Sequence, residues 1–546
     1  MILYDKIIIG ITLGGALLLL VLAGVAKKWI SNKWRMAYLV PTIATMFVLA
    51  GEGFEISMLG AYIGILLMLI GFLKEDAKVR RICCISALIL GLVTIPVCMW
   101  SPQYRSVDYV QDFQDGIASM REHYLLTEHK GIDLESLYEE YLPLFQEANK
   151  EQDAVANVIA WYRFAAEFRD GHVNFSTDDE EIMKMAWERA CGNDYGLSLM
   201  PIQSGQVVAV NVEPDSTLSR AGIQNGTVIT AWDGRRITEV ATESVAYQMH
   251  SYADQDNEAF WLPVFAAGVG GESVRITYLD DAGRERQLDL PKLGDYYERL
   301  KNTMEIVNQG VETGHMMWEE IEEQTVCLRI KMMAFDKKSS QSSDYSGMQE
   351  EIRAKVQEYK NAGKTNLILD LRDNCGGDGQ MVMALASLFA PPGEHYYCTD
   401  GLWDDLAANY VKDEKTGRFI PGKEHYFQGE NIWGDHIAIL VNSNSVSAAD
   451  HLTKIMQGMP NVTILGFTEA NGSAQGIGEV MLESGTFCFS SSLLLDKNKD
   501  IFIDSDTNRE SGNDIDVRVP FDEEAVHALF DRGEDYILQY TLEHAW

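Results

Sequence analysis

From residue 326 onward, short apolar strand-like runs alternate with segments of helical pattern, and this alternation is the strongest constraint on the fold. Strands are expected at 326–330, 366–371 and 436–441, and helices at 346–362 and 380–389. Strands that alternate with helices favour α/β units on a central sheet. The sequence therefore predicts an α/β domain in the C-terminal part of the chain.

A turn of small residues directly follows the strand-like run at 436–441. The turn reads Asn442-Ser443-Asn444-Ser445-Val446-Ser447-Ala448-Ala449-Asp450. A serine between a buried strand and a helix exposes its Oγ and has free backbone N–H groups nearby, which makes Ser447 a candidate nucleophile. Small serine-rich turns also cap helices, and the local sequence alone favours that simpler interpretation.

Two further turns offer groups that a nucleophilic serine would need. The pair Gly376-Gly377 lies at a strand-to-helix turn, where free N–H groups can hold negative charge. The phosphate-loop pattern GxxxxGK[ST] is absent, so an oxyanion site is the favoured interpretation. Helical segments between 107 and 169 end at Asp170-Gly171-His172, whose histidine either flanks a capping glycine or has a functional role.

The chain of 546 residues is long enough for two to four domains, and its net charge of −36 is unevenly distributed. Residues 1–100 hold nine basic and five acidic side chains, so all of the excess acid lies beyond them. A nucleic acid would be repelled by that acidity, which argues against a nucleic-acid partner. The eight cysteines show no CxxC spacing, so neither a zinc site nor a disulfide scaffold is indicated.

The first hundred residues carry runs typical of transmembrane helices. Residues 7–26 are apolar and uncharged, enough to cross a hydrocarbon layer of about 30 Å. Similar runs lie at 56–73 and 82–100, and a shorter one at 36–51 makes four spans the expectation and three the alternative. The basic clusters between the spans predict that the rest of the chain is extracytoplasmic. The sequence thus predicts a multi-pass cell-membrane protein with a bilayer-embedded domain at 1–101.

Residues 195–292 change to short strands separated by turns. Their pattern of Ala-Gly-Ile at 221–223 followed by Gly-x-x-Ile-x-x-x-x-Gly at 226–234 resembles a PDZ domain. Such domains hold a peptide C-terminus on the backbone N–H groups of a Gly-Leu type loop. The resemblance implies that Tyr195, Gly196 and Leu197 bind a peptide, and it leaves open that the module is only a lid.

Taken in order, these motifs resemble the S41 serine peptidases, the group that includes C-terminal processing proteases and tricorn-like enzymes. The matching stretches are Asp170-Gly171-His172, Leu369-Asp370-Leu371-Arg372-x-Asn374-x-Gly376-Gly377, the serine turn, and Gly512-Asn513-Asp514-Ile515-Asp516-Val517-Arg518-Val519. The resemblance covers about residues 105–530. It implies a helical cap at 102–190, a PDZ-like β domain at 191–292 and a ClpP/crotonase-like α/β catalytic core at 293–546.

The family uses two catalytic arrangements, and the sequence distinguishes them. Processing proteases pair the serine with a lysine, but Asn471 stands at the matching position and an amide cannot take a proton from a serine. The tricorn-like branch instead brings a histidine from the cap, where His172 stands. The resemblance thus implies Ser447 as nucleophile and His172 as general base and then acid. Lys454 is expected to be solvated, and His451 to point elsewhere.

The same branch supplies a third catalytic residue and an oxyanion hole. Its third residue is a glutamate shortly before the closing motif, for which Glu510 is the nearest acid and Asp506 the alternative. The backbone N–H of Gly376 or Gly377, together with that of Ala448, would hold the oxyanion. The chemistry needs neither a metal nor an organic cofactor.

The leading hypothesis is a membrane-anchored, extracytoplasmic serine endopeptidase that cleaves polypeptides through an acyl-enzyme and can capture a C-terminal tail. One alternative is a catalytically silent peptide-binding or sensor protein on an S41 scaffold, because the lysine is missing and the acid is displaced. The other alternative is a transporter or sensor in which the membrane spans carry the function, although those spans lack a convincing buried charge pair.

Overall fold

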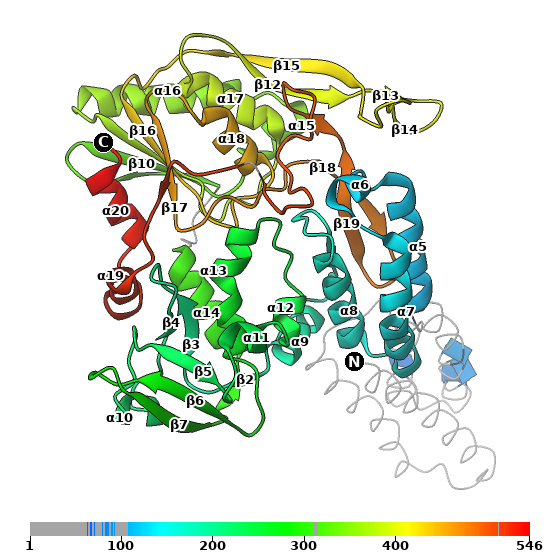
Figure 1. Cartoon of the computed structure of the whole chain (residues 1–546). Helices are drawn as coiled ribbons and strands as arrows, with labels where there is room; N and C mark the ends of the chain where they lie inside the picture. The colour runs from blue at the N-terminus through cyan, green and yellow to red at the C-terminus, as the bar shows by residue number, and fades with distance from the viewer. Residues whose placement is uncertain are drawn as a thin grey trace. The chain divides into compact units, whose positions relative to one another are not determined.

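The computed structural model describes residues 107–309, 315–511 and 513–546, with isolated helical positions between 63 and 92 (Figure 1). The chain divides into two compact units, Met1–Val107 and Asp108–Trp546. All the elements treated below belong to the second unit.

The prediction of a multi-span membrane domain, and with it of a multi-pass cell-membrane location, is contradicted. A helix needs about 20 mainly apolar residues to cross a bilayer. Among the residues that the structure describes, no helix combines that length with that apolarity. Apart from isolated positions, the runs at 7–26, 36–51, 56–73 and 82–100 lie outside the described residues.

The core of the second unit is a central sheet. Its strands are β9 (Met316–Glu320), β10 (Thr325–Ile330), β11 (Asn366–Asp370), β16 (His436–Leu440), β17 (Val462–Gly466) and β21 (Val517–Arg518), in the order β21-β17-β16-β11-β10-β9. Neighbouring strands are parallel except for β9, which is antiparallel to β10. The expected strands at 326–330, 366–371 and 436–441 are confirmed, and their near-continuous burial is typical of parallel strands covered on both faces.

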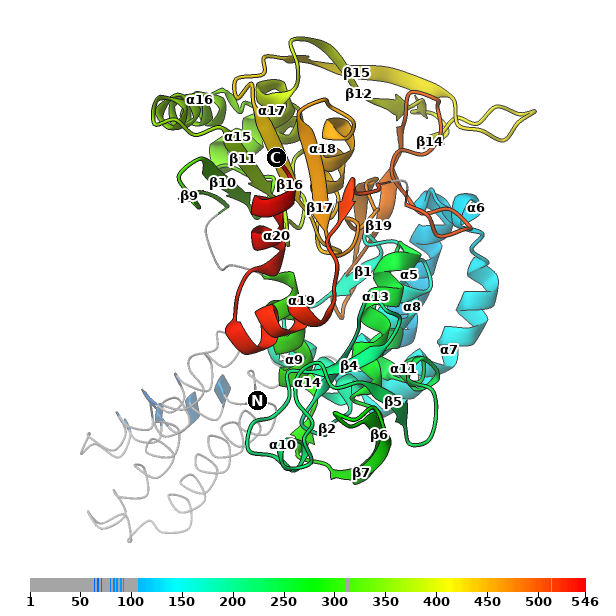
Figure 2. The same ribbon diagram turned by 60° about the vertical axis from the view of Figure 1, so that its left-hand side comes forward.

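Alternate side chains of the central sheet pack on two different groups of helices. Leu328 and Leu369 join the hydrophobic cluster of α16, α17 and α18, whereas Cys327 and Ile368 join the cluster of α13, α14 and α20 (Figures 1 and 2). This division follows from the two-residue period of a strand. The helix bounds are α13 Gln255–Ala266, α14 Tyr297–Asn308, α16 Ser346–Asn361, α17 Gly379–Phe389, α18 Ala448–Met456 and α20 Tyr536–His544.

An N-terminal helical cap packs on a second, smaller sheet. Helices α5 (Tyr109–His123), α7 (Leu134–Glu151) and α8 (Ala154–Ala166) share an aromatic core in which the rings of Phe113 and Phe145 stack with centroids 4.1 Å apart. After the cap, β1 (Asn174–Ser176) pairs with β19 (Thr486–Ser492), which also pairs with β18 (Gly476–Met481). The turn that carries His172 is therefore fixed between the cap and the C-terminal part of the chain.

The module between the cap and the core holds short strands, as expected. Strand β3 pairs with β4, and β5, β6 and β7 form a separate sheet, while β2 pairs with β8 where the module closes. The comparison with a PDZ domain stays a prediction. The bounds are β2 Asn193–Asp194, β3 Ser198–Pro201, β4 Val207–Val210, β5 Ile229–Trp232, β6 Ser273–Leu279, β7 Glu285–Pro291, β8 Gly294–Asp295, α9 Glu180–Cys191, α10 Thr217–Arg220, α11 Ile237–Ala241 and α12 Val245–Gln248.

The remaining elements lie around the core. An antiparallel ribbon of β12 and β15 extends beyond the sheet and carries the β13–β14 hairpin (Figure 1). The C-terminal α20 lies beside β17 (Figure 2). The bounds are α6 Thr127–Lys130, α15 Lys337–Ser342, β12 Gly393–Gly401, β13 Trp403–Asp404, β14 Asn409–Tyr410, β15 Pro421–Gly429, β20 Leu494–Leu495 and α19 Glu523–His527.

Candidate active site

Ser447 occupies a strained backbone position between β16 and α18. Its φ of 63° and ψ of −115° lie in a region that side-chain-bearing residues rarely adopt. Such a conformation costs about 1–3 kcal/mol and persists only where the surrounding structure holds it. Ser447 is the N-cap of α18, and the Asp450 carboxylate accepts its N–H at 2.9 Å, so the turn does cap the helix. Capping a helix does not require this strained backbone conformation, so the cap alone does not explain it.

The other two serines of the turn have structural hydrogen bonds. The buried Ser445 Oγ donates to the carbonyl of Leu371 at 2.8 Å. The Ser443 Oγ accepts a hydrogen bond from the indole of Trp261 at 3.1 Å. Ser447, by contrast, is partly exposed. Of the three hydroxyls, that of Ser447 is the one placed to meet a substrate.

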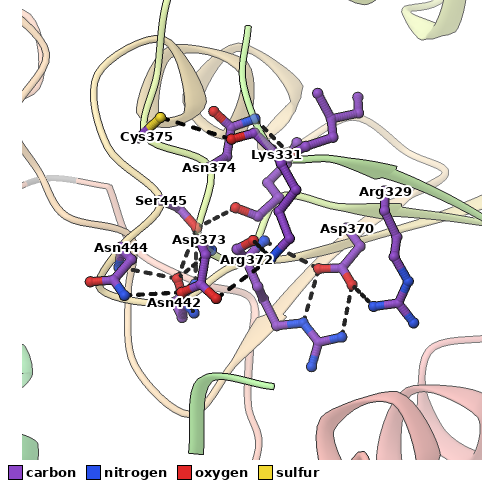
Figure 3. A network of polar contacts seen from close by, with 12 residues as sticks. Arg329, Lys331, Asp370, Arg372, Asp373, Asn374, Cys375, Asn442, Asn444 and Ser445 are labelled. Atoms are coloured by element: carbon purple, nitrogen blue, oxygen red, sulfur yellow. Dashed lines mark hydrogen bonds and ion pairs between the residues drawn. The ribbon is translucent and has the colours of Figure 1, made fainter. Parts of the chain in front are cut away.

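Two loops that follow neighbouring parallel strands are locked to one another (Figure 3). Asp373, after β11, accepts hydrogen bonds from the side-chain amides of Asn442 and Asn444, each at 2.9 Å. Asn442 in turn accepts the backbone N–H of Asp373 at 3.0 Å. Because the carboxyl ends of parallel strands meet at one edge of the sheet, this is the usual place for a ligand site in such a fold.

A buried ion-pair network anchors the same edge of the sheet (Figure 3). The Asp370 carboxylate pairs with Arg329 and Arg372, each at 2.7 Å, and Arg372 also pairs with Asp535 at 2.7 Å. Burial would raise the pKa of the Asp370 carboxyl, but the guanidinium groups hold it below its usual value. Removing one partner would leave an uncompensated buried charge, so these residues fix the loops rather than act on a substrate.

The glycine pair packs directly against Ser447. A Cβ added at Gly376, whose φ is 86°, would lie 2.7 Å from the Cβ and 3.2 Å from the Oγ of Ser447. The N–H of Gly376 donates to the side chain of Asn374 at 2.9 Å. Within the described part of the chain, the N–H groups of Gly377 and Ala448 have no such partner. These two are the backbone donors available for a developing oxyanion.

Ser473 connects the serine turn to the histidine turn. Its carbonyl accepts the N–H of Ser447 at 3.0 Å, and its Oγ accepts the N–H of Gly171 at 2.8 Å. A Cβ at Gly171 would lie 2.4 Å from the Oδ1 of Asn471, so the close approach requires a glycine. The structure thereby brings the turns at 170–172 and 442–450 together from opposite ends of the unit.

His172 is 3% exposed, and neither of its ring nitrogens has a hydrogen bond to any described residue. Its backbone N–H donates to the Asp170 carboxylate at 2.9 Å. Burial lowers the pKa of the imidazole, an effect that Asp170 opposes and Lys130 reinforces. His172 is therefore a neutral imidazole with a free acceptor nitrogen. Catalytic hydrogen bonds often tighten only when substrate is bound, so the free nitrogen does not argue against a role as base.

The structure does not bring the expected third residue to His172. Glu510 is exposed, and Asp506 accepts hydrogen bonds from Asn508 instead. A different buried carboxylate, Asp504, lies in this region and forms an ion pair of 2.5 Å with Lys130. Burial raises the pKa of Asp504 to about 8, although Lys130 opposes the shift.

Asp450 is a site residue that the sequence reasoning missed. Its fully buried carboxylate accepts the N–H groups of Ser447 and Gly472 at 2.9 Å and of Ser473 at 3.4 Å, and the side-chain amide of Asn513 at 2.8 Å. One side chain thus holds the serine turn, the 471–473 stretch and the closing segment. The available signal was the Ser-x-x-Asp spacing of a capping box.

We expect Asp450→Asn to lower kcat by about 10–100-fold and the free energy of unfolding by about 1–3 kcal/mol, because the amide would point a donor at backbone N–H groups. Chemical denaturation and initial-rate measurements check the two values. Lys454→Gln, a partly exposed position on the same helix, is the control and should change neither value. A kcat within twofold of wild type would contradict a role of Asp450 in holding Ser447.

The other residues considered as bases in the sequence make hydrogen bonds that are unrelated to a catalytic role. Asn471, at the position of the family's dyad lysine, donates through its side-chain amide to the carbonyl of Ser443 at 3.0 Å and so supports the serine turn. His451 is buried, lies 2.8 Å from the carbonyl of Ala474 and contacts Tyr397. Lys454 lies 3.1 Å from Gln457 on its own helix.

The expected peptide-binding loop is already hydrogen-bonded within the module. Tyr195 and Leu197 are buried, and the hydroxyl of Tyr195 donates to the carbonyl of Gly271 at 2.7 Å. The N–H of Gly196 donates to the Asp194 carboxylate at 2.8 Å. A peptide carboxylate would have to replace Asp194 at this N–H.

Two family models match the chain. Residues 327–495 match the model of peptidase family S41, and residues 106–159 match that of the tricorn protease C1 domain. The first match includes the serine turn and the central-sheet strands from β10 to β17, and the second spans most of the helical cap. No curated protein matches the chain.

Solved peptidase structures resemble the chain over most of its length. Mature CPAF is 13% identical and covers 80% of this chain and 97% of its own, with a TM-score of 0.49. A putative peptidase from Parabacteroides merdae is 14% identical over 80% of this chain and 96% of its own, with a TM-score of 0.41. The photosystem II D1 C-terminal processing protease is 16% identical over 79% and 98%, with a TM-score of 0.32. Residues 327–495 therefore form a peptidase family S41 domain, and on that evidence the chain is a serine peptidase.

Proposed function

We propose that this peptidase is an endopeptidase that cleaves polypeptides through an acyl-enzyme, with Ser447 as nucleophile and His172 as general base. The observation that carries the proposal is the junction at Ser473, which joins a strained serine turn to the turn of a buried, neutral histidine. A histidine base is also consistent with Asn471, which cannot replace the lysine of the processing proteases.

The proposed chemistry follows from these groups. Ser447 Oγ attacks the substrate carbonyl while an imidazole nitrogen of His172 takes the hydroxyl proton. The oxyanion that forms is held by the N–H groups of Gly377 and Ala448, each worth about 3–4 kcal/mol in the transition state. His172 then gives its proton to the leaving amine, and water hydrolyses the acyl-enzyme by the same steps.

Two finer roles stay predictions. A third catalytic residue at Glu510 or Asp506 would require the loop at 496–511 to move toward His172. Capture of a C-terminal tail by Tyr195, Gly196 and Leu197 would require the N–H of Gly196 to exchange Asp194 for the ligand carboxylate.

The direct test of the proposal is hydrolysis of a fluorogenic protein substrate by the whole chain. Wild type is expected to release internal peptides, and Ser447→Ala is expected to release none. Products that consist only of single terminal residues would overturn the endopeptidase assignment. Hydrolysis that persists in Ser447→Ala would overturn the assigned nucleophile.

The pH dependence provides a further prediction. His172 can accept a proton only when neutral, so activity is present above its pKa and is lost as the pH falls through it. Burial lowers that pKa from 6.5, so the acid limb of kcat/KM should be centred below pH 6.5. A stopped-assay pH profile checks this. A limb near 7 would contradict it and point to Asp450, whose pKa burial raises to about 7.

A further inference from the structure

A cavity of about 350 Å³ lies beside the two loops that hold the serine turn. Its walls are mainly apolar: Trp187 comes from α9, and Leu300 and Met304 come from α14. Asp373 and Asn444, which come from the two loops and are hydrogen-bonded to each other at 2.9 Å (Figure 3), also line the cavity. The volume is within the range of side-chain and small-ligand sites, about 300–1,000 Å³.

The cavity is close enough to the reacting groups to receive part of a bound substrate. Asn444 is three residues before Ser447, and Asp373 is three residues before Gly376. Three residues of chain span at most about 11 Å. An extended peptide advances about 3.3 Å per residue. The cavity wall is therefore within about three substrate residues of the scissile bond.

The chemistry of the cavity favours an uncharged occupant. His250 lines it, and its ring lies against that of Trp187 in a tilted arrangement, with centroids 5.1 Å apart. Burial lowers the pKa of His250 to about 4, so the ring is neutral. Lys301 and Glu305, the charged residues that α14 adds, are exposed and of opposite sign. The wall also holds the Asp373 carboxylate, which already pairs with Lys331 at 3.5 Å and accepts the side-chain amides of Asn442 and Asn444. A charged substrate side chain would therefore lose its hydration in this cavity without gaining a free partner.

We propose that this cavity is the specificity subsite of the peptidase and accepts one large apolar side chain, that of leucine, methionine or phenylalanine, within three residues of the cleaved bond. The inference rests on the proposed function at Ser447. The Asp373–Asn444 hydrogen bond fixes the cavity wall to the turn that carries Ser447. A polypeptide bound at Ser447 therefore passes the cavity, and its side chain is the occupant that we assign. Hydrophobic pockets of this kind discriminate between side chains by about 10–200-fold.

The experiment compares wild type with Met304→Trp, which fills the cavity, on peptides that differ only by leucine or alanine at the scanned position. Wild type is expected to prefer leucine at one position by at least about tenfold. Met304→Trp should lose that preference, so that its rates on the leucine and alanine peptides agree within about threefold. Glu298→Trp, an exposed change on the same helix, is the matched control and should behave as wild type.

Two readouts separate failure of this inference from failure of the proposed function. Labelling by a fluorophosphonate probe reports whether the catalytic groups of Met304→Trp are intact. Binding of the same peptides to Ser447→Ala, with and without Met304→Trp, is measured by fluorescence polarisation and tests the leucine preference without turnover. The inference is overturned if Met304→Trp keeps the leucine preference in both assays, or if wild type has none. Hydrolysis that survives in Ser447→Ala would overturn the proposed nucleophile and leave the binding comparison valid.

Discussion

Replacing Ser447 with alanine should lower kcat by at least about 10⁴-fold and leave KM almost unchanged. The change removes the atom that bonds to the substrate carbonyl, whereas the oxyanion donors and the substrate subsites remain. Initial rates on the fluorogenic protein substrate measure the loss. The free energy of unfolding should stay within about 1 kcal/mol of wild type, because alanine keeps the same Cβ and backbone conformation and loses only the hydroxyl's share of the helix cap.

The neighbouring serines provide matched controls for this result. Ser445→Ala removes a buried hydrogen bond to Leu371 and should lower the free energy of unfolding by about 1–3 kcal/mol. Because its hydroxyl is directed at a backbone carbonyl, that variant should still react with a fluorophosphonate probe. A Ser447→Ala variant with more than a tenth of wild-type activity would show that the nucleophile is another residue.

Replacing His172 with alanine should lower kcat by at least about 10³-fold, because Ser447 would lose its general base. The imidazole is buried, but its ring nitrogens have no partner among the described residues. Replacing it should therefore lower the free energy of unfolding by less than replacing a core histidine that makes hydrogen bonds. Added imidazole should restore part of the rate by entering the vacated space. Rates with and without imidazole, measured between pH 5 and 8, check both effects.

His451 is the matched control for His172. It is equally buried, but its ring contacts Tyr397 and the carbonyl of Ala474. His451→Gln should therefore lower stability and leave the acid limb of the pH profile unchanged. If His451→Gln abolished activity and His172→Ala did not, the histidine one helical turn beyond Ser447 would be the base.

Much of the site was predictable because its parts are local in sequence. A buried strand followed by small residues predicts the turn that holds Ser447, and the Gly376-Gly377 pair predicts close backbone approach to it. The family motifs connected these turns to the Asp-Gly-His turn. Each of these signals depends on a few adjacent residues, and such local patterns can be recognised in a single sequence.

The parts that could not be predicted depend on contacts between distant residues. The Ser473 bridge joins positions 302 residues apart, and the pairing of β1 with β19 depends on the same packing. Glu510 was placed by its spacing from a motif, but the loop that carries it leaves the side chain exposed. Asp450 was overlooked because a Ser-x-x-Asp spacing indicates a cap and does not show that three other backbone and side-chain donors converge on the carboxylate.

The acyl-enzyme should form on Ser447. The most direct test is to treat the whole chain with a fluorophosphonate, digest it, and map the modified residue by mass spectrometry. One dominant adduct is expected on Ser447, absent from Ser447→Ala and formed much more slowly in His172→Ala. An adduct on any other serine, or a folded wild-type chain that forms none, would contradict this assignment.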